Sequence, residues 1–299
     1  PMVIYLAIRG LSPEEINKIA YISVLIAPLS IVFYLYSVYE EGNLSIFLLG
    51  DMAEHGGANI SYNSYVPYIT FPFISAIYLI ATKNGLILKS FCLGSLAVMS
   101  IFIFLSSSRQ SILFILFAFF LFLIFDKSSI YRRVIFYCSI LGSVATLFFI
   151  VLSDVEISEG LINKYQSGGE TSRFQILING FNLLRPHEFL TGAGLTSVVN
   201  SGPHNDYLRW TQRVGFIFMI ISFMPFFIAA IKSSSNMFSA STKQIHIFIS
   251  LALFFTLYHS IFGYPREDAF QALFCFLGLA LYLGYQKYKI FEIKEEKHQ

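Results

Sequence analysis

The feature that most constrains this sequence is a series of apolar stretches, each about as long as a bilayer is thick. A helix crosses the hydrocarbon core of a membrane with roughly 17 to 25 predominantly apolar residues. Eight such stretches occur, and their middles contain no Asp, Glu, Lys or Arg; they cover residues 19–38, 65–81, 90–106, 111–125, 134–152, 214–231, 245–260 and 268–285. Charged residues make up only 13% of the chain, whereas soluble domains carry roughly 25%. We therefore predict an all-α, polytopic bundle of transmembrane helices that forms one domain over residues 1–299.

The first residues predict a partial span in addition to these eight. The sequence starts with Pro1, and an apolar run from Val3 to Ile8 is followed by Arg9. A signal peptide would have its positive charge before the apolar run. We interpret this segment as the end of a spanning helix whose beginning is missing from the sequence.

Lysine placement predicts the orientation of the spans. If residues 9–18 are cytoplasmic, alternation makes the segments 82–89, 126–133 and 232–244 and the tail from residue 286 cytoplasmic too. Ten of the eleven lysines then fall on that side: Lys18, Lys83, Lys89, Lys127, Lys232, Lys243, Lys287, Lys289, Lys294 and Lys297. Only Lys164 falls outside. Because cytoplasmic loops carry an excess of Lys, we predict a multi-pass protein with a cytoplasmic C-terminus.

Arginine has the opposite distribution. Six arginines fall on the outer side under this topology: Arg109, Arg173, Arg185, Arg209, Arg213 and Arg266. A planar guanidinium binds phosphate through paired donors of fixed geometry, which a lysine ammonium cannot do. We therefore predict that a phosphate-bearing ligand binds at the outer face. The alternative is that these arginines snorkel at the interface or form ordinary ion pairs with loop carboxylates such as Glu156, Glu159, Glu170 and Glu188.

The segment 153–213 is the longest outer loop, and a loop with its own polar pattern is more often functional than passive. Within it, the sequence from Arg173 to Arg185 is typical of an interfacial helix with Thr171 or Ser172 as its N-cap. Its apolar residues are Phe174, Ile176, Leu177, Ile178, Phe181 and Leu184. Further along, Gly192 and Gly194 form a Gly-x-Gly pattern that permits a tight turn and a close backbone approach to a ligand. Since no strand precedes the pattern, it does not indicate a nucleotide fold.

A second helix is predicted to start after Pro203. Helical spacing puts neighbouring side chains three and four residues apart, which defines two faces: His204, Leu208 and Thr211 on one, and Asp206, Arg209 and Arg213 on the other. An imidazole near a carboxylate and two guanidinium groups suits glycosyl transfer, because one group removes a proton from a sugar hydroxyl while fixed cations stabilise a departing diphosphate. The alternative is that His204 caps the helix or packs at the membrane surface.

At this point the sequence resembles the O-antigen polymerase and O-antigen ligase superfamily of polytopic membrane glycosyltransferases. Four features carry the resemblance: Ser107-Ser108-Arg109 at the outer end of a span, Arg173 at the start of the loop helix, Pro186 to Gly194 ending in Gly-x-Gly, and Pro203-His204-Asn205-Asp206-Tyr207-Leu208 before the next span. Two positions depart from the family pattern. Gln110 replaces a frequent Gly, and Arg213 replaces a frequent acidic residue.

The resemblance implies a specific reaction and a set of site residues. Members of this superfamily act at the periplasmic face of the bacterial inner membrane on sugars carried by undecaprenyl diphosphate. Arg109 and Arg173 are expected to bind the diphosphate and His204 to activate the acceptor hydroxyl. From their position alone, Arg209, Arg213 and Arg266 are further candidates for diphosphate binding. The expected supporting residues are Asn205, Asp206, Gly192 and Gly194. We expect the lipid bilayer and a chain-length regulator protein as partners, and neither a cofactor nor a nucleic acid.

Several alternatives stay open at this stage. We favour a polymerase of O-antigen or capsular repeat units, but an O-antigen ligase or related oligosaccharyltransferase uses the same lipid-linked donor. A flippase or transporter is a second alternative, although such proteins usually place ionisable residues within their spans. A metal site could use the acids Asp154, Glu156, Glu159 and Glu170, but solvated loop acids are the simpler interpretation, so we predict no metal.

Overall fold

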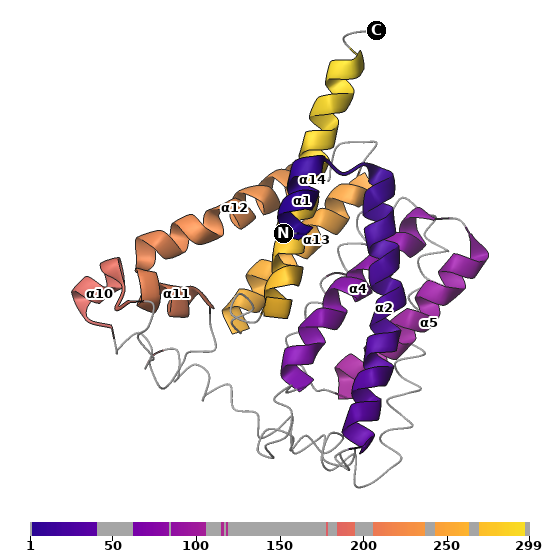
Figure 1. The fold of residues 1–299 in the computed structure, drawn as a ribbon, viewed down its shortest axis with the longest axis horizontal. Coiled ribbons are helices and arrows are strands. Elements are labelled where there is room, and N and C mark those ends of the chain that lie inside the picture. The colour runs from indigo at the N-terminus through magenta and orange to yellow at the C-terminus, as the bar shows by residue number, and fades with distance from the viewer. Residues whose placement is uncertain are drawn as a thin grey trace. The chain divides into compact units, whose positions relative to one another are not determined.

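The computed structural model describes ten segments of the chain: residues 2–40, 62–83, 85–105, 115–116, 118, 178, 184–194, 206–236, 243–262 and 269–296. Nine helices are named within these segments: α1 (Met2–Arg9), α2 (Pro13–Glu40), α4 (Tyr62–Thr82), α5 (Leu86–Leu105), α10 (Pro186–Thr191), α11 (Asp206–Val214), α12 (Phe216–Ser235), α13 (Lys243–Phe262) and α14 (Ala269–Glu296) (Figure 1). No strand occurs among the described residues. The all-α prediction is therefore confirmed for this part of the chain.

Three described helices are long and apolar enough to cross a membrane, judged by length and composition. They cover Pro13–Phe33, Leu86–Ile103 and Phe216–Ser235, and a shorter apolar helix covers Ile69–Thr82. These four coincide with predicted spans, and α13 and α14 cover two more. The predicted spans 111–125 and 134–152 lie almost entirely outside the described residues, so the total of eight stays a prediction.

Helix boundaries differ from the hydropathy boundaries for physical reasons. Helix α2 begins six residues before the apolar stretch at 19–38, because Pro13 suits the first helical position and Glu14 and Glu15 complement the helix dipole in the first turn. Helix α14 continues eleven residues past the apolar stretch that ends at 285, since a helix can leave the apolar region without ending.

The described chain divides into two compact units, one containing residues 1–13 and 169–299 (unit 1) and the other residues 14–168 (unit 2). In unit 2, α4 packs against α5 and is buried along residues 69–79. The Tyr78 hydroxyl donates a 2.8 Å hydrogen bond to the Asn17 side-chain oxygen of α2, and the Tyr21 and Phe91 rings lie 6.5 Å apart. These contacts join α2, α4 and α5.

The core of unit 1 is α13, which packs between α12 and α14 and is buried along most of its length. Gly278 of α14 permits a close approach, because an added Cβ would lie 2.9 Å from the Ala252 carbonyl carbon. Near one end of α13, the Ser233 hydroxyl donates to the His246 carbonyl at 3.1 Å. Near the other end, the Tyr207 hydroxyl of α11 donates to the Leu257 carbonyl at 2.9 Å. Helices α12 and α13 are therefore antiparallel, and α11 lies at the far end from Ser233.

Candidate functional site

The candidate site of unit 1 is built on α10 and α11, two short helices at the start of α12 (Figure 1). Helix α10 begins with Pro186 at its first position, and the Glu188 carboxylate accepts a 2.9 Å hydrogen bond from the Arg185 backbone N–H. It ends where the Gly192 N–H donates to the Glu188 carbonyl at 2.7 Å. The Phe189 ring stacks on Phe216 of α12 at a centroid distance of 5.0 Å, which fixes α10 beside the start of α12.

Three glycines join the turn after α10 to the end of α11. Gly192, Gly194 and Gly215 have φ angles of 79°, 105° and 87°, a region that side chains with a Cβ rarely adopt. A Cβ on Gly192 would lie 2.4 Å from the Arg213 carbonyl oxygen, and one on Gly215 would lie 2.0 Å from the Leu190 carbonyl oxygen. Around Gly194, no described atom lies within 4 Å of an added Cβ. The close approach at Gly192 is thus to backbone of the protein itself.

Hydrogen bonds explain why the turn and the helix end fit together. The last carbonyls of an α-helix have no partner within the helix and must be satisfied elsewhere. The Ala193 N–H donates to the Gln212 carbonyl at 2.7 Å, and the Gly194 N–H donates to the Arg213 carbonyl at 3.2 Å. The Gly-x-Gly turn therefore caps α11 and holds Arg213 at a fixed place.

Helix α11 has a buried face and a partly exposed face. Leu208 and Thr211 are each only 2% exposed, and Tyr207 packs on Phe223 of α12 at a ring distance of 4.2 Å. Arg209 and Arg213 are one helical turn apart and half-buried, so their guanidinium groups lie on the same side of α11. The two-faced character predicted for this helix is confirmed for these four residues.

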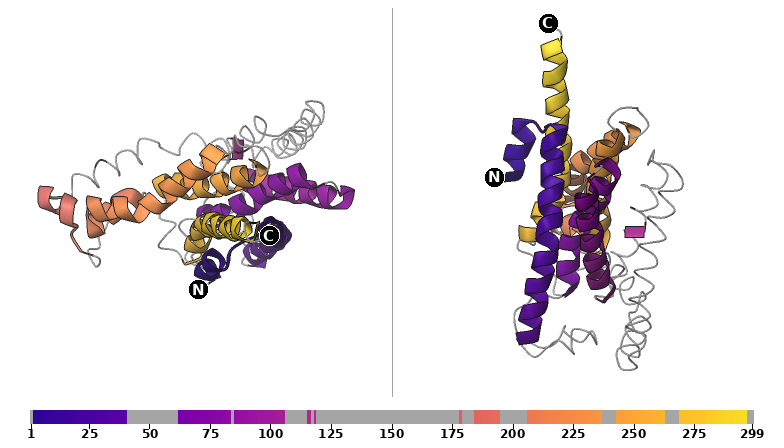
Figure 2. Two further views of the ribbon diagram at one scale, coloured as in Figure 1. Left: turned by 90° about the horizontal axis from the view of Figure 1, so that it is seen from above. Right: turned by 90° about the vertical axis from the view of Figure 1, so that its right-hand side faces the viewer.

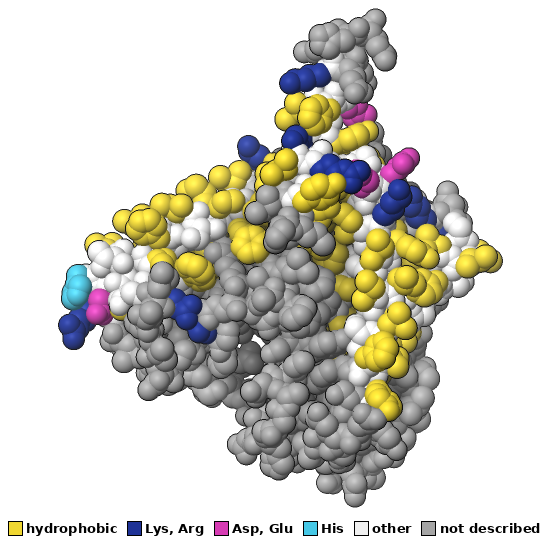
Figure 3. Space-filling view, in the orientation of Figure 1, with side chains coloured by type: hydrophobic (Ala, Val, Ile, Leu, Met, Phe, Trp, Pro, Cys, Tyr) yellow, Lys and Arg dark blue, Asp and Glu magenta, His cyan; other side chains and the backbone are white. Residues whose placement is uncertain are grey.

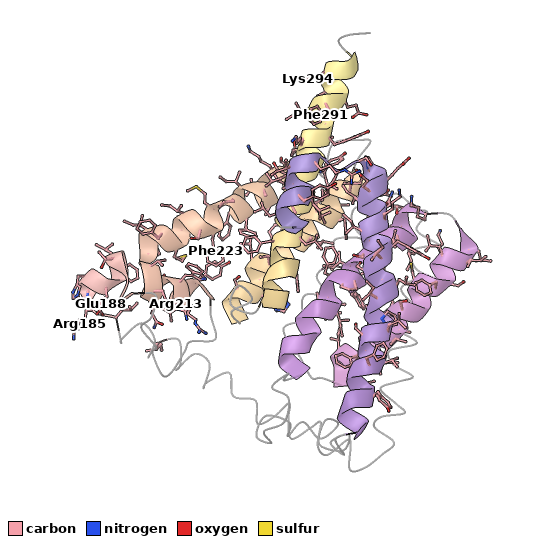
Figure 4. The ribbon with its side chains drawn as sticks, viewed as in Figure 1. Arg185, Glu188, Arg213, Phe223, Phe291 and Lys294 are labelled. Carbon is pink, nitrogen blue, oxygen red and sulfur yellow. The ribbon has the colours of Figure 1, made fainter. Side chains whose placement is uncertain are left out.

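Arg185 and Arg213 lie at the opposite end of unit 1 from Lys232 and Lys243, although Arg9 of α1 lies with the lysines of α14. Figure 4 shows Arg185, Glu188 and Arg213 together at the end formed by α10 and α11, with Lys294 far from them on α14. Figure 3 shows basic, acidic and His side chains gathered over α10 and α11. Lys232 is near the end of α12 and Lys243 begins α13, beside the Ser233–His246 contact. The arginine end and the lysine end of unit 1 are therefore opposite.

This region coincides with a match to a known family. Residues 94–223 match the family described as O-antigen ligase, and the match includes the Gly-x-Gly turn, α11 and the start of α12. Over this segment, the chain is similar to the O-antigen ligase family, which supports the resemblance to the O-antigen ligase and polymerase superfamily. No curated protein matches the chain. Together with the membrane-length helices, the family indicates a glycosyltransferase-like enzyme of the bacterial inner membrane that acts on lipid-linked oligosaccharides in polysaccharide biosynthesis.

The structure describes only part of the predicted site. The turn at Gly192 and Gly194 meets the backbone of Arg213, Arg209 lies one helical turn earlier on α11, and Asp206 begins that helix. The remaining predicted residues lie outside the described part of the chain: His204, Asn205, Arg109, Arg173 and Arg266. The acids proposed as the alternative metal site, Asp154, Glu156, Glu159 and Glu170, lie outside it too. Among the residues that the structure describes, no three metal-ligating side chains form a group.

Sequence reasoning missed two features of this end. It did not predict α10, although Pro186 after Arg185 and Glu188 three residues later form a helix-start signal. It also gave Gly215 no role beyond the end of a motif, because the residue that Gly215 contacts, Leu190, is far away in sequence.

Proposed function

We propose that this protein polymerises undecaprenyl-diphosphate-linked oligosaccharide repeat units, of O-antigen or capsule, at the periplasmic face of the membrane. The observation that carries the proposal is the family match across the glycine turn and α11, the region in which Arg209 and Arg213 are held one turn apart. Guanidinium pairs suit a diphosphate because each can donate two parallel hydrogen bonds to phosphate oxygens.

The position of the lysines supports the orientation of this site. Lys232, Lys243 and Lys287 belong to the lysine end of unit 1, and an excess of lysine marks the cytoplasmic side. The opposite end, with α10 and α11, then faces the periplasm and the C-terminus is cytoplasmic. The test is labelling of single cysteines by a membrane-impermeant reagent in whole spheroplasts, at the exposed positions His187 and Lys294. Reaction at 294 and protection at 187 would reverse the proposed orientation.

In the proposed reaction, His204 accepts the proton of an acceptor sugar hydroxyl. The hydroxyl oxygen attacks the anomeric carbon of a second lipid-linked chain, so a C–O bond to the acceptor forms as the C–O bond to the diphosphate breaks. Both electrons of the broken bond leave with undecaprenyl diphosphate, whose charge Arg109 and Arg173 stabilise, and His204 later releases its proton to solvent. Fixed cations of this kind lower the barrier most where negative charge develops.

The remaining site residues are assigned supporting roles. Arg209, Arg213 and Arg266 bind the diphosphate more peripherally, and Asn205 and Asp206 orient His204. Gly192 and Gly194 position Arg213, because the turn that they form caps the end of α11. The mechanism uses no metal and no cofactor.

A ligase is the second candidate, and the name of the matched family favours it. A ligase would transfer the same donor glycan to a lipid A core, or in related enzymes to a protein, so the donor site would be unchanged. The flippase alternative differs more, since transport leaves the donor covalently intact.

One in vitro experiment separates these three functions. The purified chain is supplied with a defined undecaprenyl-diphosphate-linked repeat unit, alone or with a lipid A core acceptor, and the glycans are analysed by mass spectrometry. Polymerisation predicts a ladder of repeats from the donor alone. Transfer of single units, seen only when the core acceptor is present, would establish the ligase instead. An unchanged donor in both reactions, with movement across proteoliposome membranes, would establish transport.

A further inference from the structure

The lysine end of unit 1 carries a surface that the proposed glycosyl transfer does not use. It is formed by α1 and the C-terminal half of α14, which pack closely against each other. The Leu11 N–H donates to the Gly284 carbonyl at 2.8 Å, and a Cβ on Gly284 would lie 2.7 Å from the Leu6 carbonyl oxygen. A larger residue at 284 would force the two helices apart. Side chains on α1 and α14 are therefore held at fixed positions relative to one another.

Helix α14 is longer than a membrane requires. Its 28 residues correspond to about 42 Å at 1.5 Å per residue, whereas the hydrocarbon core is about 30 Å thick. The apolar sequence ends at Tyr285 and lysines follow at 287 and 289. The C-terminal turns of α14 project past the other helices of unit 1 (Figures 1 and 2). The boundary between the apolar segment and these turns is where phospholipid headgroups are expected.

Cations and aromatic rings from both helices meet at this boundary. The Arg9 guanidinium lies 5.9 Å from the centroid of the Tyr5 ring, and the Lys287 ammonium lies 5.7 Å from that of Phe291. The Lys287 ammonium also donates a hydrogen bond to the carbonyl of Ile8, the residue next to Arg9. A cation within about 6 Å of a ring face is stabilised there. The Lys287 ammonium is thus held against the last turn of α1, the turn that carries Arg9.

One face of α14 extends this arrangement along the helix axis. Leu283, Lys287, Ile290 and Lys294 recur at helical spacing and share a face, and Leu283, Ile290 and Lys294 are exposed. Figure 4 shows Phe291 and Lys294 on the projecting end of α14. No acidic residue occurs in 2–11 or in 269–291; toward the C-terminal end of α14, Glu292, Glu295 and Glu296 follow. The part of this face nearest the apolar segment is therefore purely cationic and apolar.

We propose that the α1–α14 basic surface, defined as Tyr5, Arg9, Leu283, Lys287, Phe291 and Lys294, binds the headgroup of an anionic phospholipid. The phosphate contacts Arg9 and Lys287, and an acyl chain lies along exposed Leu283 one turn toward the apolar segment. A free phosphate would use the cations alone. A phospholipid also covers the exposed apolar side chains beside them, which is why the lipid is the occupant that fits.

The test measures lipid binding to the purified full chain by native mass spectrometry. Phosphatidylglycerol is titrated against phosphatidylcholine as the zwitterionic reference. A basic residue near an anionic headgroup contributes about fivefold to affinity, so the double variant Arg9→Gln/Lys287→Gln should bind phosphatidylglycerol about 25-fold more weakly. The matched control is Lys83→Gln/Lys232→Gln, which removes the same charge from the same predicted side of the membrane. It should stay within about twofold of the wild type.

Because Lys287 also contacts Ile8, its loss could loosen α1, and two further variants avoid that problem. Lys294→Gln changes an exposed side chain and should weaken phosphatidylglycerol binding about fivefold. Tyr5→Leu/Phe291→Leu keeps apolar area and removes both rings, and it should weaken binding severalfold. In 1 M salt the preference for phosphatidylglycerol should disappear, since the screening length falls to about 3 Å.

Three results would overturn the proposal. Equal loss of phosphatidylglycerol in the control pair would show that only total charge matters. Equal loss of phosphatidylcholine in the surface variants would show general damage to unit 1. A wild-type chain that binds the two lipids equally would show that the surface has no anionic ligand. None of these outcomes depends on glycosyl transfer, so the proposal stands or falls separately from the proposed function.

Discussion

Replacing Gly215 with Ala tests how the glycine turn holds the arginine helix. Two costs add at this position. A residue with a Cβ at a left-handed φ costs roughly 1–2 kcal/mol, and here φ is 87°. The new Cβ would also lie 2.0 Å from the Leu190 carbonyl oxygen, and forcing atoms into a packed region costs typically 1–3 kcal/mol. We expect Gly215→Ala to destabilise the junction of α10, α11 and α12 by about 2–5 kcal/mol.

Two matched glycines separate the two costs. Gly194 has a φ of 105° but no described atom near an added Cβ, so Gly194→Ala should cost only about 1–2 kcal/mol. Gly94 lies inside α5, and no described atom lies within 4 Å of an added Cβ there. Gly94→Ala should therefore be neutral or stabilising by up to about 1 kcal/mol.

The assay uses the single tryptophan of the chain, Trp210, which lies on α11 itself. Thermal unfolding in detergent is followed by Trp210 fluorescence for the three variants and the wild type. We expect the transition temperature to fall most for Gly215→Ala, less for Gly194→Ala and not at all for Gly94→Ala. If Gly215→Ala unfolds like Gly94→Ala, the turn does not hold α11 and the reasoning is wrong.

Three further predictions concern the candidate site and the proposed reaction. Tyr207→Phe removes the donor to the Leu257 carbonyl but keeps the ring, so the Trp210 transition should show a loss of about 1–3 kcal/mol; an unchanged transition would contradict the contact. Arg213→Lys keeps the positive charge and the backbone carbonyl that accepts the hydrogen bond from Gly194. It should still reduce polymer formation about 10- to 100-fold, because a charge-assisted hydrogen bond is worth about 1.5–3 kcal/mol. Full activity would show that the planar guanidinium is not used. Arg173→Ala and His204→Ala should each abolish long-chain polysaccharide in a complementation assay while the protein inserts normally, and wild-type chain length in either would remove that residue from its proposed role.

Hydropathy predicted the spanning helices because their signal is local and long. Helix α12, expected at 214–231, is observed at Phe216–Ser235, and Gly215 starts it with a positive φ that only the structure reveals. Helix α14 continues eleven residues past the predicted span at 268–285, because a scan for apolar residues stops at the first lysines whereas the helix does not. Membrane helices are therefore readable from sequence, and their polar extensions are not.

The candidate site was harder to predict because its contacts are non-local. The faces of α11 followed from spacing, since Leu208 and Thr211 are buried and Arg209 and Arg213 are not fully buried. The Gly-x-Gly turn was correctly located, but its partner is backbone near Arg213, twenty residues along the chain. Glycine indicates that something must come close, and the sequence does not identify which atoms do.

The central claim is that His204 activates an acceptor hydroxyl for displacement of undecaprenyl diphosphate. The most direct measurement is the rate at which undecaprenyl diphosphate is released from a defined lipid-linked repeat unit by the purified chain. His204→Asn should release it no faster than the uncatalysed reaction, while His187→Asn, a control at an exposed His on α10, should match the wild type. Release by His204→Asn at the wild-type rate would contradict the account.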